Sequence, residues 1–188
     1  MPNREILEGA ERYMSLVLIY RGLLPTVNDK NKRKEEKQII RRVFHGQLSV
    51  AFKKPYMQLL SSPDLFRPQR VGDFNFHPLI FKDKWYGRRG CELDIKILSN
   101  DPFGAIYQSG DLDNRLKTLF DALCAPNKDQ LAAGDYPQET EDPFWVLLSD
   151  DRLITDVHIV QDILNFHMDD ENYVELTITV KIKDGYQA

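Results

Sequence analysis

The feature that most constrains the fold is a strict alternation of apolar and polar residues near the C-terminus. Between 174 and 182 every second residue is apolar, and Glu, Thr and Lys fill the positions between them. The shorter segment 93–97 alternates in the same way. This period of two predicts β-strands with one buried face. A short apolar run at 14–20 and a segment rich in β-branched residues at 154–163 predict two further strands.

Two other segments have the period of an amphipathic helix. Apolar residues recur every three to four positions over 32–54, and again over 112–123. The expected order is therefore strand, helix, strand, helix, strand, strand. We expect an α+β fold with two layers, in which one mixed four-stranded sheet carries two main helices.

The 188 residues suit a single domain spanning 1–188, because a chain of this length can bury about 70% of its unfolded surface. Two stretches interrupt the pattern and are interpreted as insertions, at about 55–90 and 125–143. The first is rich in proline and aromatic residues, and its prolines argue against regular structure. The second belongs to an acidic connection, 124–149, that has no clear period.

Three observations predict a soluble cytoplasmic protein without a membrane span. Cys91 and Cys124 are too few and too isolated for a disulfide framework or a cysteine zinc site. The charged N-terminus does not resemble a signal peptide. The longest apolar run, 16–20, is far shorter than the roughly 20 residues of a membrane helix.

Charge is divided unequally between the two halves of the chain. Residues 1–100 contain 19 Lys and Arg against 11 Asp and Glu, a net charge of +8. The remainder contains 6 basic and 18 acidic residues, a net charge of −12. Such asymmetry favours a nucleic acid or another polyanion as partner of the basic half. A well-solvated surface of mixed charge is the alternative.

The strongest chemical signal is Asp111-Leu112-Asp113-Asn114 followed by Lys117, where the second helix is expected to begin. A second acidic pair, Asp150-Asp151, directly precedes the next strand. If these four carboxylates converge, their repulsion requires a cation, and oxygen ligands favour Mg²⁺ or Mn²⁺. Taken singly, an aspartate that caps a helix and an Asp–Lys pair four residues apart are common stabilising features.

These residues resemble the RusA-type Holliday-junction resolvases, small dimeric Mg²⁺-dependent endonucleases. The family motif is D-[LI]-D-N-x-x-K-x-x-x-D-A-L followed by D-D, and every position is filled between 111 and 123 and at 150–151. The resemblance covers 110–123 and 144–182. This chain differs from the family pattern in two respects. No basic residue stands directly before Asp111, and the connection from the helix to the acidic pair is long, at 26 residues.

The resemblance implies a structure-selective DNA endonuclease that resolves branched DNA such as Holliday junctions as a homodimer, in DNA recombination and repair. It implies that Asp111, Asp113 and Asp151 are metal ligands, with Asp150 as a further candidate. The expected catalytic residues are Asp113, Asp151 and Lys117. A divalent ion would activate the attacking water, and Lys117 would neutralise charge on the phosphoryl oxygens or orient the water.

Basic residues beside aromatic ones are candidates for binding DNA, because they can neutralise phosphates and stack on bases. Two segments contain them, within the first helix and within the first insertion: Lys30, Lys32, Arg33, Lys34, Arg41, Lys84, Trp85, Arg88 and Arg89. A solvated helix face is the alternative for the first segment, and packing of the aromatic residues inside the insertion for the second.

Two other functions remain open. The chain could be a catalytically inert protein of the same fold that binds DNA or a protein partner, which the missing basic flank would suit. It could also be a nuclease of the PD-(D/E)xK type that uses Asp64, Asp94 and Lys96, although such a triplet arises often by chance. The histidines have no zinc-binding spacing.

Overall fold

A computed structural model describes six stretches of the chain, apart from the side chains of Lys30, Asp111 and Glu139. These stretches are residues 14–24, 30–54, 68–81, 90–100, 111–131 and 137–183.

Four long strands form the main sheet, in the order β1-β7-β4-β6. They are β1 (Met14–Leu23), β4 (Gly90–Ser99), β6 (Ile154–Ile163) and β7 (Tyr173–Lys183). Strand β7 is antiparallel to both of its neighbours, and β6 is parallel to β4. The sheet is therefore mixed and four-stranded, as the sequence predicts.

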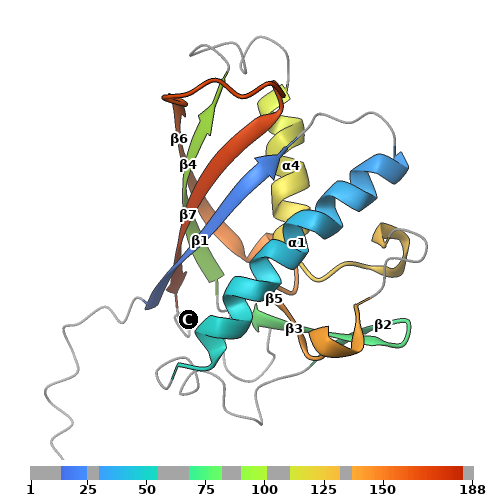
Figure 1. Ribbon diagram of the computed structural model, residues 1–188. Helices are drawn as coiled ribbons and strands as arrows, with labels where there is room; N and C mark the ends of the chain where they lie inside the picture. The colour runs from blue at the N-terminus through green and yellow to red at the C-terminus, as the bar shows by residue number, and fades with distance from the viewer. Residues whose placement is uncertain are drawn as a thin grey trace, which may run out of the picture.

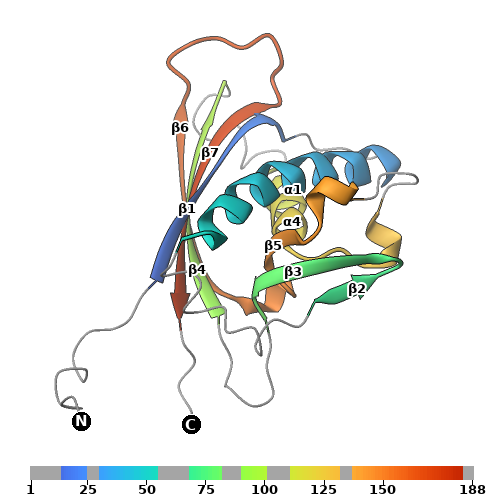
Figure 2. The ribbon, with the colours of Figure 1, turned by 60° about the horizontal axis from the view of Figure 1, so that its bottom comes forward.

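Two helices, α1 (Lys30–Phe52) and α4 (Asp111–Leu123), pack on one face of this sheet (Figures 1 and 2). The core between the layers takes its apolar residues from both helices and from alternate positions of the strands, including Phe44, Leu93, Leu119, Ile178 and Val180. The fold is therefore α+β with two layers, and its main elements follow one another in the predicted order.

Strand β1 extends beyond the predicted limit of residue 20 because of a local contact at Gly22. A Cβ atom there would lie 2.7 Å from the hydroxyl oxygen of Tyr20. Without one, the buried Tyr20 ring fits against the strand, and its hydroxyl donates a hydrogen bond to the carbonyl oxygen of Leu23 at 2.7 Å. Glycine thus allows the strand to continue to Leu23.

A second, smaller sheet corrects the prediction that the first insertion, 55–90, lacks regular structure, and it adds a strand within the connection 124–149. It has the order β2-β3-β5, with β2 (Gln69–Val71), β3 (Phe74–Ile80) and β5 (Phe144–Leu148). Strand β3 includes Pro78, which lies beyond the end of β2 and pairs only with β5. Strand β5 is continuously apolar, and β3 alternates only from Phe74 to His77 before the run Pro78-Leu79-Ile80, so neither strand shows a sustained alternation.

Aromatic contacts join the second sheet to α1. Trp145 of β5 stacks on Phe52, with 3.8 Å between ring centroids, and Phe144 stacks on His45 at 4.3 Å. The backbone N–H of Trp145 also donates a hydrogen bond to Nδ1 of His45. Strand β5 thus fixes the small sheet to the same helix that covers the main one.

Within the described ranges, neither α1 nor α4 has the length and apolar character required to cross a bilayer.

Candidate functional site

The D-x-D-N-x-x-K motif begins helix α4. Asp113, Asn114 and Lys117 lie on its exposed side, while Arg115 and Thr118 face the interior. Asp113 and Lys117 are one turn apart on the helix, so both can reach the same solvent-facing ligand. Asp111 is the first residue of the helix. The side chain of Asp111 lies outside the described part of the structure.

The second acidic pair lies at the start of β6. Asp150 caps the short 3₁₀ turn Asp151–Leu153, and its Oδ1 accepts a hydrogen bond from the N–H of Arg152 at 2.9 Å. Asp150 and Asp151 line an open, polar hollow of about 280 Å³. Its other walls come largely from the end of α4 and the residues after it, including Asp121, Cys124, Asn127 and Gln130.

The two halves of the motif therefore lie at opposite ends of α4. The helix connects the parallel strands β4 and β6, so it begins beside the end of β4 and ends beside the start of β6 (Figure 1). Asp121, which shares the hollow with Asp151, follows Asp113 by eight residues, or about 12 Å of helix. Ligands of one Mg²⁺ lie about 2.1 Å from the ion. Asp113 is therefore separated by about two turns of α4 from the wall of the hollow that Asp121 and Asp151 line.

The expected convergence of four carboxylates is thus not found among the described residues of a single chain. No group of three or more His, Cys, Asp or Glu side chains in those stretches could hold a metal ion. The Asp111 side chain lies outside those stretches, so the metal centre that the resemblance implies stays a prediction.

Asp121, the aspartate of the D-A-L part of the motif, has a structural contact that the sequence analysis missed. Its carboxylate forms an ion pair with the buried Lys37 of α1. The signal in the sequence was weak, because the partners are 84 residues apart. This pair holds α1 against the end of α4 and fixes one wall of the hollow.

The prediction that Arg41 binds DNA is wrong. Its side chain is 1% exposed. It donates hydrogen bonds to the carbonyl oxygens of Cys124 at 3.1 Å and Asp121 at 2.8 Å, and to Oε1 of Gln38. A guanidinium buried in this way cannot reach a phosphate. It instead caps the last carbonyl groups of α4.

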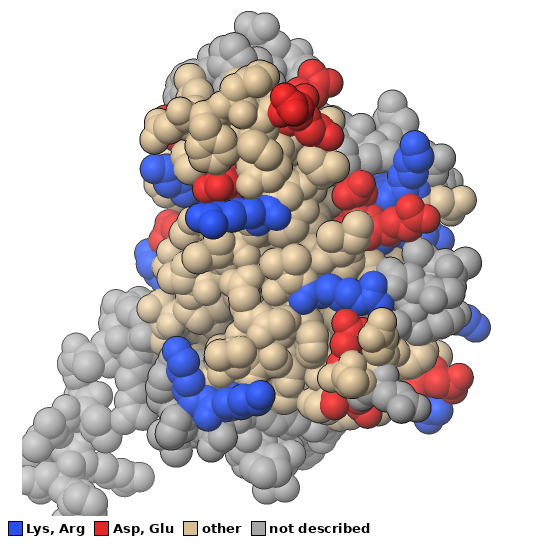
Figure 3. Space-filling view, in the orientation of Figure 1, with Lys and Arg blue, Asp and Glu red and all other residues tan. Residues whose placement is uncertain are grey.

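The rest of the predicted DNA surface is only partly described. Lys32 is exposed and Arg33 and Lys34 are half-buried on α1, whereas the side chain of Lys30 and the four insertion residues lie outside the description: Lys84, Trp85, Arg88 and Arg89. On the face shown in Figure 3, the described basic side chains are interspersed with acidic ones. DNA binding through these residues stays a prediction.

Two residues of the alternative nuclease motif, Asp94 and Lys96, lie on the opposite face of the main sheet from the helices. Asp94 forms ion pairs with Lys181 at 2.7 Å and with His158 at 3.5 Å. The hydrogen bond from Lys181 lowers the pKa of Asp94. Lys96 lies 3.7 Å from Asp162. Asp64 is outside the described residues, so this motif is not tested.

The two cysteines are poor nucleophiles in this fold. Burial raises the pKa of the Cys91 thiol to about 12, and it raises the pKa of Cys124 still further, with Asp151 and Asp121 adding to the shift. Both thiols are therefore protonated at neutral pH, and cysteine chemistry does not compete with the aspartates as the reactive group.

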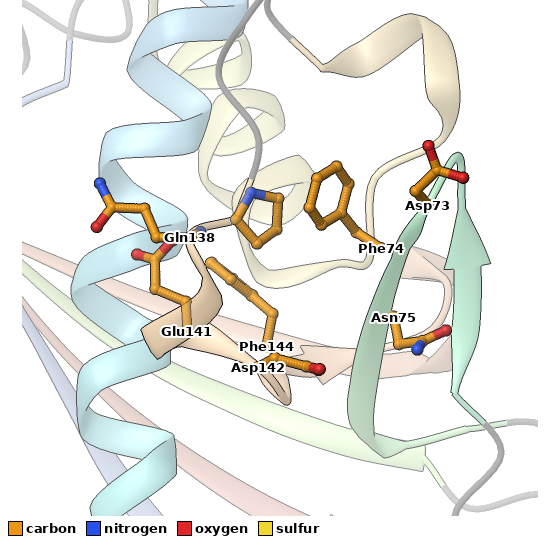
Figure 4. A pocket seen from close by; sticks show the side chains of 8 residues that line it. Asp73, Phe74, Asn75, Gln138, Glu141, Asp142 and Phe144 are labelled. Atoms are coloured by element: carbon orange, nitrogen blue, oxygen red, sulfur yellow. The ribbon is translucent and has the colours of Figure 1, made fainter.

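A second hollow, of about 180 Å³, lies between the β2–β3 hairpin and the segment before β5 (Figure 4). The rings of Phe74 and Phe144 form its apolar wall, and Asp73, Glu141 and Asp142 lie around it. Glu141 is held by Arg42 at 3.1 Å. This hollow contains none of the predicted catalytic residues.

Comparison with protein-family models, with curated protein sequences and with solved structures finds no match to this chain.

Proposed function

We propose that this protein is a Mg²⁺-dependent, structure-selective DNA endonuclease of the RusA type, acting on branched DNA such as Holliday junctions as a homodimer. One observation carries the proposal: Asp113 and Lys117 lie together on the exposed side of the first turns of α4. The pair Asp150-Asp151, which the family motif requires, lies just before β6.

The surroundings of these residues support the proposal. Asp113 and Lys117 have no role in the core that would explain an acid and a base at these positions. An exposed ammonium beside an exposed carboxylate can contact the phosphoryl oxygens of a nucleic-acid backbone. The order of the main elements is also that of the family. A cytoplasmic location follows from the proposed role in DNA recombination and repair.

A second function is favoured by the separation of Asp113 from Asp151. A protein that binds DNA or a protein partner without cleaving it needs no shared metal centre. On that alternative, the acidic hollow beside Asp151 and the motif at the start of α4 would be independent parts of a binding surface.

The direct test is cleavage of a synthetic four-way junction, a flap and a linear duplex, with and without Mg²⁺. We expect cleavage of branched DNA that requires Mg²⁺ and falls by at least about 100-fold in Asp113→Asn. Junction binding, measured by gel shift in Ca²⁺ or EDTA, should persist in this variant. The matched control is Asp169→Asn, an exposed aspartate between β6 and β7.

Cleavage that survives Asp113→Asn would remove this residue from the active site. Binding without cleavage by the unmodified protein would favour the second function.

A further inference from the structure

The hollow between the β2–β3 hairpin and the segment before β5 is built by the two insertions, which the RusA resemblance does not cover. Asp73, Phe74 and Asn75 come from the hairpin in the first insertion, and the lining residues between 137 and 142 come from the second. Only Phe144 lies inside a segment that the resemblance covers. The hollow is therefore an addition to the family pattern, and the proposed DNA cleavage does not account for it.

Aromatic rings form the apolar part of this hollow. Phe144 is buried and fixed in place, because its ring stacks on His45 at 4.3 Å and lies 5.2 Å from the ring of Phe76. Phe74 is only half-buried, and its ring projects from β3 into the space between the hairpin and the segment before β5 (Figure 4). The open face of an aromatic ring attracts cations, because it carries partial negative charge.

Glu141 has a structural role in one wall of the hollow. One of its oxygens accepts a hydrogen bond from Nε of Arg42 at 3.1 Å, and the other accepts one from the backbone N–H of Gln138 at 2.8 Å. These contacts hold the wall against α1. The charge of Glu141 is compensated by Arg42, so this residue is not the main source of negative potential in the hollow.

The other two carboxylates are exposed at the rim. Asp73 lies 3.8 Å from Arg70, in an exposed ion pair that water screens. No described residue forms an ion pair or a hydrogen bond with Asp142. Its carboxylate extends toward β3 at Asn75, across the hollow from Phe74 (Figure 4). The hollow therefore combines an accessible aromatic ring with a carboxylate whose charge is not neutralised.

The size and charge of the hollow narrow the class of ligand. Its volume of about 180 Å³ is smaller than the roughly 300–1,000 Å³ of pockets that hold drug-sized ligands, so it suits a group the size of one side chain. The carboxylates repel phosphate, which argues against nucleic acid. A planar guanidinium can stack on an aromatic ring and also donate two parallel hydrogen bonds to a carboxylate.

We propose that this hollow binds the guanidinium group of an arginine, which stacks on Phe74 and donates hydrogen bonds to Asp142. The exposed side-chain oxygen of Asn75, at the same rim, is a further acceptor. The rim is open to solvent, so the group can come from an arginine on the surface of a partner protein or from free arginine. The site does not depend on the proposed nuclease activity.

The ligand class is tested by titrating the isotope-labelled, full-length protein and following its backbone amide signals by NMR. The probes are the capped peptide Gly-Arg-Gly, the same peptide with lysine or citrulline in place of arginine, and free L-arginine. We expect saturable shifts at residues 73–75 and 137–144 with the arginine peptide. Citrulline has nearly the same shape without the charge, so its peptide should bind at least about tenfold more weakly. The lysine peptide should also bind more weakly, because an ammonium cannot stack.

The two sources of the group are distinguished by the same titrations. Tighter binding of the peptide than of free arginine assigns the hollow to a protein partner, and equal or tighter binding of free arginine assigns it to the small molecule. A citrulline or lysine peptide that binds as tightly as the arginine peptide overturns the proposal, as do shifts that fall outside the hollow or an absence of binding.

Two variants test the contacts. Asp142→Asn keeps the shape of the side chain and removes its charge, so the arginine peptide should bind at least about tenfold more weakly. Phe74→Leu should weaken binding by about threefold through the loss of the ring. The matched controls are Asp169→Asn and Phe166→Leu, at exposed positions outside the hollow, and they should bind like the unmodified protein.

An affinity that Asp142→Asn leaves unchanged overturns the proposal. Because Asp142 is exposed, this variant should stay folded, which its amide spectrum outside the hollow verifies. Cleavage of a four-way junction should be the same in Asp142→Asn as in the unmodified protein. The arginine site and the proposed nuclease are thus judged in separate assays, and either can fail without the other.

Discussion

Arg41 shows how a single buried charge can organise the end of a helix. The last carbonyl groups of α4 have no partners within the helix, and Arg41 of the neighbouring α1 donates to one of them, that of Asp121, and to the carbonyl oxygen of Cys124 directly after the helix. Lys37 adds an ion pair to the side chain of Asp121. These contacts fix the C-terminal end of α4, and therefore the hollow beside Asp151.

Replacing Arg41 should be strongly destabilising. Arg41→Leu leaves the two carbonyl groups without donors in a buried site, and we expect a loss of about 3 kcal/mol in the free energy of unfolding. Urea denaturation followed by circular dichroism measures it. Lys34→Leu, which replaces a half-buried lysine on the same helix, serves as the control. A loss below about 1 kcal/mol would show that the guanidinium is not essential to this helix end.

At the scale of elements, Gln47 protects strand β1 from pairing with other chains. Gln47→Ala removes both hydrogen bonds to the backbone of Ile19. We expect a loss of about 1 kcal/mol in the free energy of unfolding and faster aggregation on heating, measured by light scattering. Val50→Ala, at an exposed position of the same helix, should change neither. Unchanged aggregation in Gln47→Ala would show that β1 is protected in another way.

Strands β1 and β6 were predicted from an apolar run and from β-branched residues. The other four main elements, α1, β4, α4 and β7, could be predicted because each has a face toward the core and a face toward solvent. Such elements produce a clear period, as in β7, where Val174, Leu176 and Ile178 alternate with polar residues. Strand β5 could not be predicted in this way, because its residues are buried or half-buried on both faces. Its burial depends on contacts with α1, such as the hydrogen bond from Trp145 to His45, 100 residues away in the sequence.

At the scale of the whole molecule, His45 connects the main layers to the second sheet and should make that connection sensitive to acid. Burial lowers the pKa of His45. In the unfolded chain its pKa returns to about 6.5, so the unfolded state binds more protons below that pH. The contribution of His45 is complete above about pH 6.5 and is lost as the pH falls toward the lower pKa of the folded state. The expected slope is at most about 1.4 kcal/mol per pH unit.

Urea denaturation between pH 5 and 8 measures how the free energy of unfolding depends on pH. His45→Asn keeps an acceptor for the N–H of Trp145 but cannot titrate, so the variant should be less stable at pH 8 and lose less stability on acidification. Burial also lowers the pKa of His77, so some dependence should remain. His167→Asn, at an exposed position, is the control. An unchanged slope in His45→Asn would contradict the prediction.

The sequence by itself determined the secondary structure of the main sheet and its helices, because periodicity follows from which faces of an element are buried. It also identified the acids and the lysine of the candidate site, since chemistry depends on residue type. Only the tertiary structure decided where these residues lie. A helix that connects two parallel strands must run the length of the sheet, which places Asp113 at one end of α4 and Asp151 at the other. The tertiary structure also showed that Arg41, a candidate DNA contact in the sequence, is a buried helix cap. Whether a charged side chain stays in water depends on segments that are distant in the sequence.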